Sequence, residues 1–222
     1  MWPVARVSEV AARSVGPKAG VLRHPIQRVL RLAIVTIVCG FVMAGCHPSP
    51  LPFKNVDITG ANFARDFALT DQNGHARKLA DFRGKVVVMF FGYTQCPDVC
   101  PTTMTDLATA MAMLGSDANR VQVLFVTIDP QRDTPQVLAA YVPHFDKRFL
   151  GLYGNAATTA ATAKEFKVFY QKVEGPTPTS YSMDHTAGSY VFDTQGKVRL
   201  FIREGDPPAE IAHDLKLLLA LD

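Results

Sequence analysis

The sequence predicts an α/β fold in which helices cover a central mixed sheet. Two apolar runs, residues 85–91 and 121–128, have the length of strands that are buried on both faces. A segment with helical spacing follows the first run, and residues typical of a helix start follow the second. Near the C-terminus, two short apolar segments flank a Gly-containing turn, which indicates an antiparallel hairpin. Strands that alternate with helices in this way build a layered domain.

The first elements follow from turn and cap residues. A hairpin is expected at residues 67–74, because residues 71–74 read Asp-Gln-Asn-Gly. The strand at residues 85–91 leads into a helix at residues 102–114, and the strand at 121–128 comes next. Thr134 and Pro135 fit the N-cap and first residue of a helix that ends near residue 143.

The later elements complete the layout. A helix is expected at residues 155–166, followed by a strand at 168–172. Strands at 190–192 and 198–202 form the late hairpin, and residues 206–208 begin the final helix. A buried strand that ends in cysteines above a helix, with a late hairpin and a terminal helix, is the layout of a thioredoxin-like fold. The early hairpin is then an N-terminal extension.

The N-terminal 45 residues predict a targeting segment. Arg28 and Arg31 precede the uncharged apolar run 32–44, which is too short for the roughly 20 residues that span a bilayer. Residues 43–46, Met-Ala-Gly-Cys, resemble a lipobox and make Cys46 the lipidation candidate. An uncleaved N-terminal anchor is the alternative. Residues 46–52 are then a lipidated cysteine and Pro-rich spacer, and residues 53–222 are one exported, membrane-attached domain that faces the periplasm.

The charge distribution argues against nucleic-acid binding. The whole chain has a formal net charge of +3, but residues 1–45 contain six Lys and Arg and one acid. The remainder therefore carries 17 basic and 19 acidic residues, a net charge of −2. The predicted domain is mildly acidic, with no basic stripe to collect phosphates.

The segment around Cys96 and Cys100 carries the chemistry. Pro101 favours a helix start at this point, so we expect Cys100 at the N-cap and Cys96 in a loop above it. The positive helix end would stabilise thiolates, which makes the sulfurs reactive and good ligands. Soft thiolates suit Cu(I) or Zn(II), but a structural zinc site needs four protein ligands.

A histidine could complete a copper site. His185 lies just before the strand near residue 190, in a segment that faces the cysteine loop in the thioredoxin layout. Spacing alone does not distinguish two interpretations of His185, a metal ligand and a buried, hydrogen-bonded residue. The other histidines of the predicted domain have surface patterns, and the methionines of helix 102–114 are interpreted as core residues.

Three segments together resemble the Sco/SenC family of copper-binding proteins of cytochrome c oxidase assembly. They are residues 92–101 with both cysteines, residues 126–135 with Asp129 and Asp133, and residues 184–186 with the Asp-His pair; the resemblance covers about residues 53–220. It departs at residues 187–189, Ala-Gly-Ser, where apolar residues are expected.

The resemblance implies a copper site for Cu(I) and Cu(II) with Cys96, Cys100 and His185 as ligands. Asp98, Asp184, Asp129 and Asp133 are implied candidates for orienting the ligands. For Asp98 and Asp184, a solvated carboxylate without such a role is an equal alternative. For Asp129 and Asp133, a purely structural role at the strand end and helix start is favoured.

The resemblance favours a metallochaperone over an enzyme as the function of this protein. It would deliver copper to, or redox-prepare, a copper-receiving subunit of cytochrome c oxidase. A periplasmic copper donor or thiol reductant would be a further partner. The alternative is a periplasmic thiol-disulfide oxidoreductase that uses Cys96 and Cys100 as a redox-active pair without metal. A peroxidase is disfavoured, because no activating Arg lies near the loop in the sequence.

Overall fold

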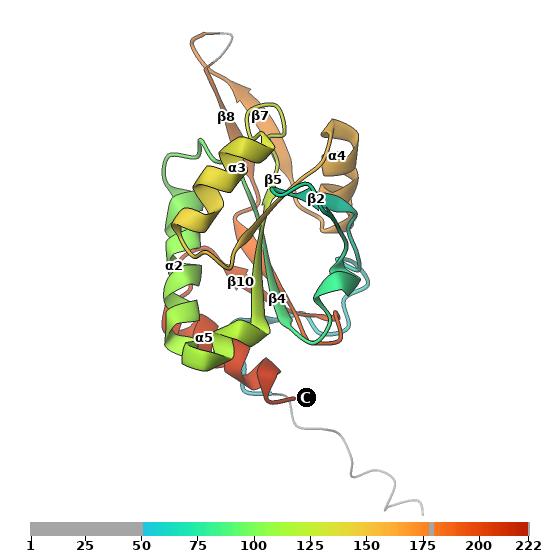
Figure 1. Ribbon diagram of the computed structural model, residues 1–222, viewed down its shortest axis with the longest axis vertical. Helices are drawn as coiled ribbons and strands as arrows, with labels where there is room; N and C mark the ends of the chain where they lie inside the picture. Colours follow the sequence, from blue (N-terminus) through green and yellow to red (C-terminus); the bar gives the residue numbers. More distant parts are fainter. Residues whose placement is uncertain (1–50, 178–179, 222) are drawn as a thin grey trace, which may run out of the picture. The chain divides into compact units, whose positions relative to one another are not determined.

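In the described part of the chain, eight strands form one mixed sheet in the order β1-β10-β9-β4-β5-β6-β2-β3, and β7 and β8 form a separate pair (Figure 1). The computed structural model describes residues 51–177 and 180–221. The strands are β1 Val56–Asp57, β2 Leu69–Asp71, β3 Ala76–Arg77, β4 Val86–Gly92, β5 Val121–Thr127, β6 Leu150–Tyr153, β7 Tyr170–Glu174, β8 Tyr181–His185, β9 Gly188–Phe192 and β10 Val198–Arg203. The α-helices are α2 Val99–Leu114, α3 Pro135–Tyr141, α4 Ala156–Glu165 and α5 Pro208–Leu219, and the 3-10 helices are Leu79–Phe82, Gly115–Arg120 and Val142–His144.

Residues from Pro52 onward form one compact unit. The predicted targeting segment and Cys46 lie outside the described residues. Within the residues described, no helix combines the length and apolar character that crossing a bilayer requires.

The centre of the sheet is parallel and its edges are antiparallel. β4 pairs with β5 and β5 with β6 in parallel, whereas β9 runs antiparallel to β4 and β10 antiparallel to β9. Every residue of β4 and β5 is buried. Continuous apolar runs produce such strands because helices cover both faces of the sheet.

Successive phenylalanines of β4 show the two faces. The Phe90 ring meets Phe125 on the side of α2 and α3, and Phe125 also packs against Tyr141 of α3. The Phe91 ring meets Phe166, which follows α4. Alternate residues of a strand point to opposite faces. The helices α2, α3 and α5 therefore lie on one side of the sheet and α4 on the other, as Figure 1 shows.

Most predicted elements are confirmed, with small shifts of their ends. The early hairpin is β2–β3, and the late hairpin is β9–β10. Thr134 caps α3 by accepting from the Val137 N–H, and Asn155 caps α4 by accepting from the Thr158 N–H. The helix predicted at residues 102–114 begins earlier, at Val99.

Three strands were not predicted: β1, β6 and β8. β1 has two residues, and β6 reads Leu-Gly-Leu-Tyr, which is too short for a periodic pattern. β8 reads Tyr-Ser-Met-Asp-His, in which exposed polar residues alternate with more buried ones. Within the described residues β8 pairs with β7 alone, so no buried sheet imposes an apolar run on it.

Candidate metal centre

The two cysteines lie where β4 passes into α2. Cys100 is the second residue of α2, and Asp98 is the N-cap, so the expectation that Cys100 is the N-cap is wrong. Pro101 is tolerated inside the helix because the N–H groups of a first turn have no intrahelical acceptor. The proline thus marks the helix start correctly, but two residues further in than expected.

The two sulfurs have different environments. Cys100 is completely buried, whereas Cys96 is partly exposed in the loop, and both are free thiols. The backbone N–H of Cys100 donates to Cys96 Sγ at 3.4 Å. Burial raises the pKa of the Cys100 thiol well above its usual range. The expectation that the helix end stabilises a thiolate is therefore wrong for Cys100, and the metal-free Cys100 thiol is protonated at neutral pH.

His185 ends β8 and reaches the cysteines from 85 residues downstream. Its Nε2 lies 3.6 Å from Cys100 Sγ, and its Nδ1 lies 3.0 Å from the carbonyl oxygen of Thr186. The rings of Phe90 and Tyr93 pack around the imidazole. Burial lowers the pKa of His185, which favours the neutral ring. A proton on Nδ1, donated to the Thr186 carbonyl, leaves Nε2 free as a metal ligand.

The ligand atoms of Cys96, Cys100 and His185 lie within 4.8 Å of one another. Ligand atoms about 2.0–2.3 Å from one ion, the range for Zn–N and Zn–S bonds, are at most about 4.6 Å apart. The three atoms are thus already close to coordinating separations. Among the described residues this is the only cluster of three or more His, Cys, Asp or Glu side chains that could hold a metal ion. Its three ligands are one fewer than a structural zinc site requires. Two sulfurs and an imidazole suit copper.

Asp133 anchors the start of the cysteine loop. Its buried carboxylate accepts hydrogen bonds from the backbone N–H of Thr94, from the Thr94 hydroxyl at 2.6 Å and from the Thr127 hydroxyl at 2.6 Å. Burial raises the pKa of Asp133. Thr94 lies two residues before Cys96, so the Asp133 carboxylate, directly before the N-cap of α3, links the cysteine loop to Thr127 at the end of β5.

Of the other three acidic residues that were candidates for orienting the ligands, one is buried and two are exposed. Asp129 is buried and accepts a hydrogen bond from the Tyr181 hydroxyl at 2.9 Å. Asp98 and Asp184 are exposed. Among the described residues neither has a hydrogen bond to Cys96, Cys100 or His185. Asp184 lies next to His185 on β8, where neighbouring side chains point to opposite faces.

Comparisons with known proteins identify the family of the chain. A family profile described as SCO1/SenC matches residues 56–220. The chain belongs to the SCO1/SenC family. A SCO2-like protein of Rickettsia felis is 37% identical over 163 residues, 73% of this chain and 77% of that protein. The human mitochondrial SCO2 homolog is 37% identical over 133 residues, which cover 59% of this chain and 50% of the human protein.

Solved structures of Sco proteins share the fold. Copper-bound ScoI of Bradyrhizobium japonicum is 39% identical, with a TM-score of 0.65, over 69% of this chain and 98% of that one. Apo Sco1 of Thermus thermophilus is 37% identical, with a TM-score of 0.69, over 78% and 100% of the two chains. The predicted family and the thioredoxin-like α/β fold are therefore confirmed.

Apolar residues were expected directly after His185, and an aromatic ring from a neighbouring strand lies over this position instead. Gly188 begins β9, and the ring of Phe201 on β10 lies over it: a Cβ at Gly188 would meet Phe201 Cζ at 2.2 Å. A large ring from the neighbouring strand thus replaces the apolar side chains that the Sco/SenC resemblance led us to expect. Met104 and Met111 of α2 are buried core residues, as interpreted from sequence, but Met113 is 48% exposed, so the interpretation is wrong for Met113.

Sequence reasoning missed Thr94, Thr127 and Tyr181, which hold the loop and hairpin of this Sco domain. Their contacts join segments 39, 6 and 52 residues apart in sequence. The motif Asp-Pro-Gln-Arg-Asp-Thr-Pro at residues 129–135 was a usable signal, because it places two carboxylates next to the cysteine loop.

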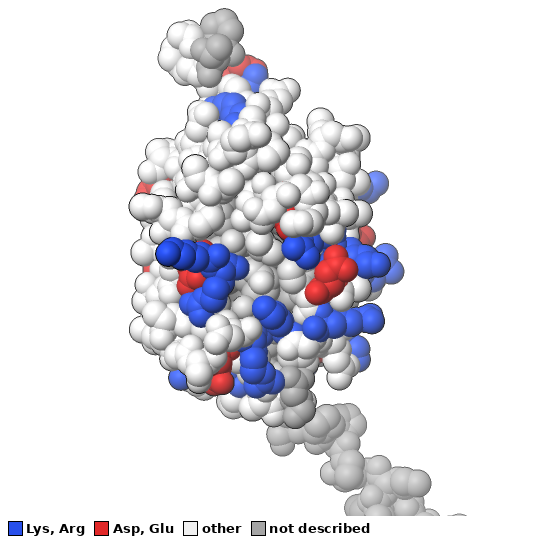
Figure 2. All heavy atoms as spheres, viewed as in Figure 1, with Lys and Arg blue, Asp and Glu red and all other residues white. Residues whose placement is uncertain are grey.

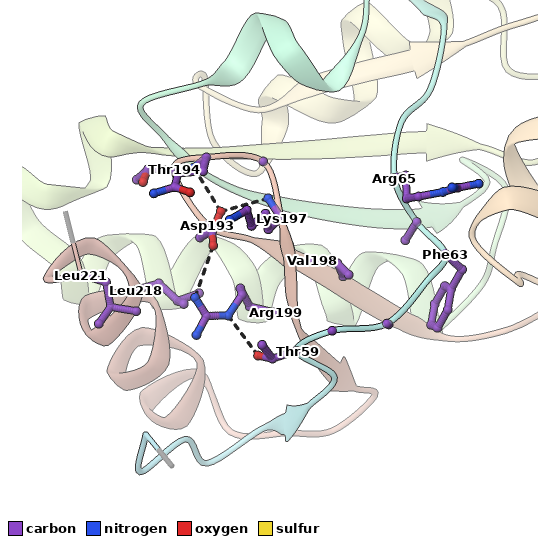
Figure 3. Close-up of a pocket in the computed structure, with 15 residues that line it drawn as sticks. Thr59, Phe63, Arg65, Asp193, Thr194, Lys197, Val198, Arg199, Leu218 and Leu221 are labelled. Atoms are coloured by element: carbon purple, nitrogen blue, oxygen red, sulfur yellow. Dashed lines mark hydrogen bonds and ion pairs between the residues drawn. The ribbon is translucent and has the colours of Figure 1, made fainter. Parts of the chain in front are cut away.

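A cavity of about 660 Å³ lies elsewhere, beside the β9–β10 turn (Figure 3). β9 starts at Gly188, close to His185, and the turn follows its opposite end. Arg199 points to Asp193 and Thr59 there, with hydrogen bonds of 3.3 Å and 3.0 Å. Positive and negative side chains also lie close together over the lower half of the face in Figure 2. Within the cavity Asp193 pairs with Arg199, whereas Arg65 pairs with Glu165 outside the lining, and the cavity adds no group to the metal centre.

Proposed function

We propose that this chain is a membrane-tethered copper metallochaperone that binds copper through Cys96, Cys100 and His185. It delivers the copper to, or redox-prepares, a copper site of cytochrome c oxidase. The observation that carries the proposal is the convergence of two sulfurs and one imidazole nitrogen within 4.8 Å. The copper-bound relatives support it, because they share the fold over most of their length.

The chemistry follows from the donor set. Copper binding replaces the thiol proton of Cys100, so binding releases protons and overcomes the high pKa that burial gives this group. Cys96 is the more accessible sulfur, so an incoming thiolate of a receiving protein exchanges first at Cys96. Stepwise ligand exchange then passes the ion on without releasing it to water.

The same pair can prepare a target by reduction. The Cys96 thiolate attacks a disulfide of the receiving protein and forms a mixed disulfide, and Cys100 then displaces the target sulfur. The S–S bond of the target breaks and one between Cys96 and Cys100 forms. Two electrons and two protons pass to the target, which becomes a dithiol. The oxidised pair no longer offers two thiolates for copper.

The tether belongs to the proposal as well. Lipidation of Cys46 or an uncleaved anchor would hold the domain at the outer face of the cytoplasmic membrane and raise its effective concentration near the oxidase. A periplasmic copper donor or thiol reductant would supply the metal or regenerate the thiols. Mass spectrometry of the membrane-bound protein tests the lipid: a diacylated Cys46 at the N-terminus is expected, and an N-terminus that retains Arg31 contradicts it.

Copper titration tests the binding site. The chain from residue 47 is reduced without oxygen and titrated with Cu(I) against a chelator, together with His185→Ala and the control His144→Ala. His144 is exposed and lies in a 3-10 helix after α3. We expect one copper per chain, weaker binding by at least about tenfold in His185→Ala, and no change in His144→Ala.

The thiol-disulfide oxidoreductase is the competing function. The free, adjacent thiols of Cys96 and Cys100 would serve it equally well. If wild type and His185→Ala bind copper alike or not at all, and both reduce a model disulfide efficiently, the metal-free oxidoreductase replaces the chaperone.

A further inference from the structure

Arg132 joins the three segments that surround the metal centre. Its guanidinium pairs with the carboxylate of Asp129, directly after β5. Nη1 donates to the backbone carbonyl of Tyr181 at 2.8 Å and to the side-chain oxygen of Gln95 at 3.2 Å. Tyr181 is the first residue of β8, and Gln95 directly precedes Cys96. One side chain thus contacts the strand that ends in His185 and the loop that holds Cys96.

The guanidinium is enclosed as well as hydrogen-bonded. Its central carbon lies 3.5 Å from the ring centroid of Tyr181 and 5.6 Å from that of Tyr93. The side chain of Arg132 is only 14% exposed. The Tyr181 hydroxyl donates to Asp129 in turn, so arginine, tyrosine and carboxylate form a closed ring of contacts. Pairs of this kind between an arginine and an aromatic ring gain strength when water is excluded.

The position of His185 depends on how the β7–β8 hairpin is held. The hairpin projects from the body of the domain (Figure 1), and its two strands pair with each other rather than with the main sheet. Tyr181, Met183 and His185 are the more buried residues of β8 and share one of its faces. Tyr181 and His185 lie four residues apart, about 13 Å along the strand. A contact that fixes Tyr181 against the body therefore fixes the direction from which His185 approaches the sulfurs.

We infer that Arg132 is a positioning residue for the metal centre: it holds the hairpin against the cysteine loop and thereby sets the distance from His185 to Cys96 and Cys100. This inference rests on the proposed copper function. Lysine cannot substitute, because an ammonium can pair with Asp129 but lacks the planar fork that also reaches the Tyr181 carbonyl and Gln95 and stacks on the tyrosine ring.

The test combines Arg132→Lys with His185→Ala. Arg132→Lys keeps a positive charge beside Asp129, and the matched control is Arg148→Lys. Arg148 pairs with Asp146 in the loop before β6, and in the described part of the chain it has no hydrogen bond to the hairpin or the cysteine loop. Cu(I) affinity is measured by chelator competition, and the Cu(II) forms are compared by electron paramagnetic resonance, which reports nitrogen ligation directly.

Arg132→Lys is expected to weaken Cu(I) binding about 10- to 100-fold and to weaken the nitrogen signal of the Cu(II) form, whereas Arg148→Lys changes neither. In the His185→Ala background, Arg132→Lys is expected to cause no further loss, because it acts through the imidazole. Wild-type affinity in Arg132→Lys overturns the inference. An equal loss with and without His185 also overturns it, since the effect then does not pass through the histidine.

A second variant covers the case in which Arg132→Lys does not fold, and His185→Ala separates a failure of this inference from a failure of the proposed copper site. If Arg132→Lys does not fold, the double variant Asp129→Asn/Arg132→Met removes both charges at similar volume, and the same binding and resonance results are expected of it. If His185→Ala binds copper as tightly as wild type, the proposed copper site itself fails. That result is distinct from a failure of Arg132, which leaves the His185→Ala effect intact.

Discussion

Gly92 is the position where one added methyl group should disturb the metal centre most directly. It ends β4, immediately before the cysteine loop. A Cβ at this position would lie 2.9 Å from Cys100 Sγ, 2.9 Å from Phe90 Cε1 and 3.0 Å from Phe125 Cε2. Optimal contacts between such atoms are about 3.5–4.0 Å, so each neighbour would have to move by about 0.5–1 Å. All three are fully buried, which leaves little room for that movement.

Gly92→Ala is expected to lower the free energy of unfolding by about 1–2 kcal/mol. Overpacking of a buried site costs about 1–3 kcal/mol, and the lower chain entropy of alanine in the unfolded state offsets about 0.5–1 kcal/mol of it. The larger effect should be on copper. A shift of about 0.5 Å in a ligand atom exceeds the tolerance of a preorganised site, so Cu(I) affinity should fall at least about tenfold.

Gly151→Ala separates packing from binding. Gly151 lies in β6, where a Cβ would meet Leu138 Cβ and Val142 Cγ2 at 3.1 Å, in the core but away from the cysteines. Urea unfolding and chelator competition are measured on both variants. Gly151→Ala should lose stability and keep its copper affinity. The reasoning is refuted if Gly92→Ala binds Cu(I) like wild type, or if Gly151→Ala loses as much affinity.

Three further predictions follow from the contacts of single carboxylates. Asp133→Ala should reduce the free energy of unfolding by about 2–3 kcal/mol and weaken copper binding, because the Thr94 N–H and the hydroxyls of Thr94 and Thr127 lose their acceptor. Urea denaturation and Cu(I) titration measure the two effects. Unchanged stability and affinity would contradict the prediction. Asp71→Asn should lower the free energy of unfolding at pH 7 by about 2 kcal/mol, because the His75 N–H and the Arg77 side chain lose a charged acceptor. Burial opposes ionisation of Asp71, but hydrogen bonds from the His75 N–H and the Arg77 side chain outweigh it and lower the pKa. A folded pKa below the unfolded one gives stability that is present above about pH 4 and lost as pH falls through the folded pKa, so the difference between wild type and variant should shrink in urea unfolding at pH 3. Asp98→Asn and Asp184→Asn should change Cu(I) affinity less than about threefold, because both side chains are exposed and make no hydrogen bond to the three ligands; a tenfold loss in either would show an orienting role.

Local patterns accounted for the central strands and helix starts of this fold. The apolar runs of β4 and β5 identify strands covered on both faces, and Thr134 and Asn155 are caps whose side chains accept from the backbone three residues on. Such features depend on neighbours in sequence, so the sequence displays them. The start of α2 was harder, because a proline is compatible with several positions in a first turn.

The environment of each sulfur could not be read from spacing. Cys96 and Cys100 are four residues apart, yet one is partly exposed and the other completely buried. Cys100 Sγ lies beside the end of β4 together with the rings of Phe90 and Phe125, since a Cβ at Gly92 would come within 3.0 Å of all three. A local pattern predicts a thiolate at a helix start, whereas desolvation by the whole core raises the pKa of Cys100 instead.

By itself, the sequence determined the α/β class, the family and the types of residue available to a metal: two thiols at a strand–helix junction and a histidine far downstream. Only the tertiary structure decided that the histidine meets the sulfurs, and it did so through contacts between segments about 40–85 residues apart. The hairpin that carries His185 has no apolar run of its own, and Arg132 and Asp129 hold it from the end of β5. Contacts at that separation leave no periodic trace, because each partner is a single polar residue whose role exists only once the chain has folded.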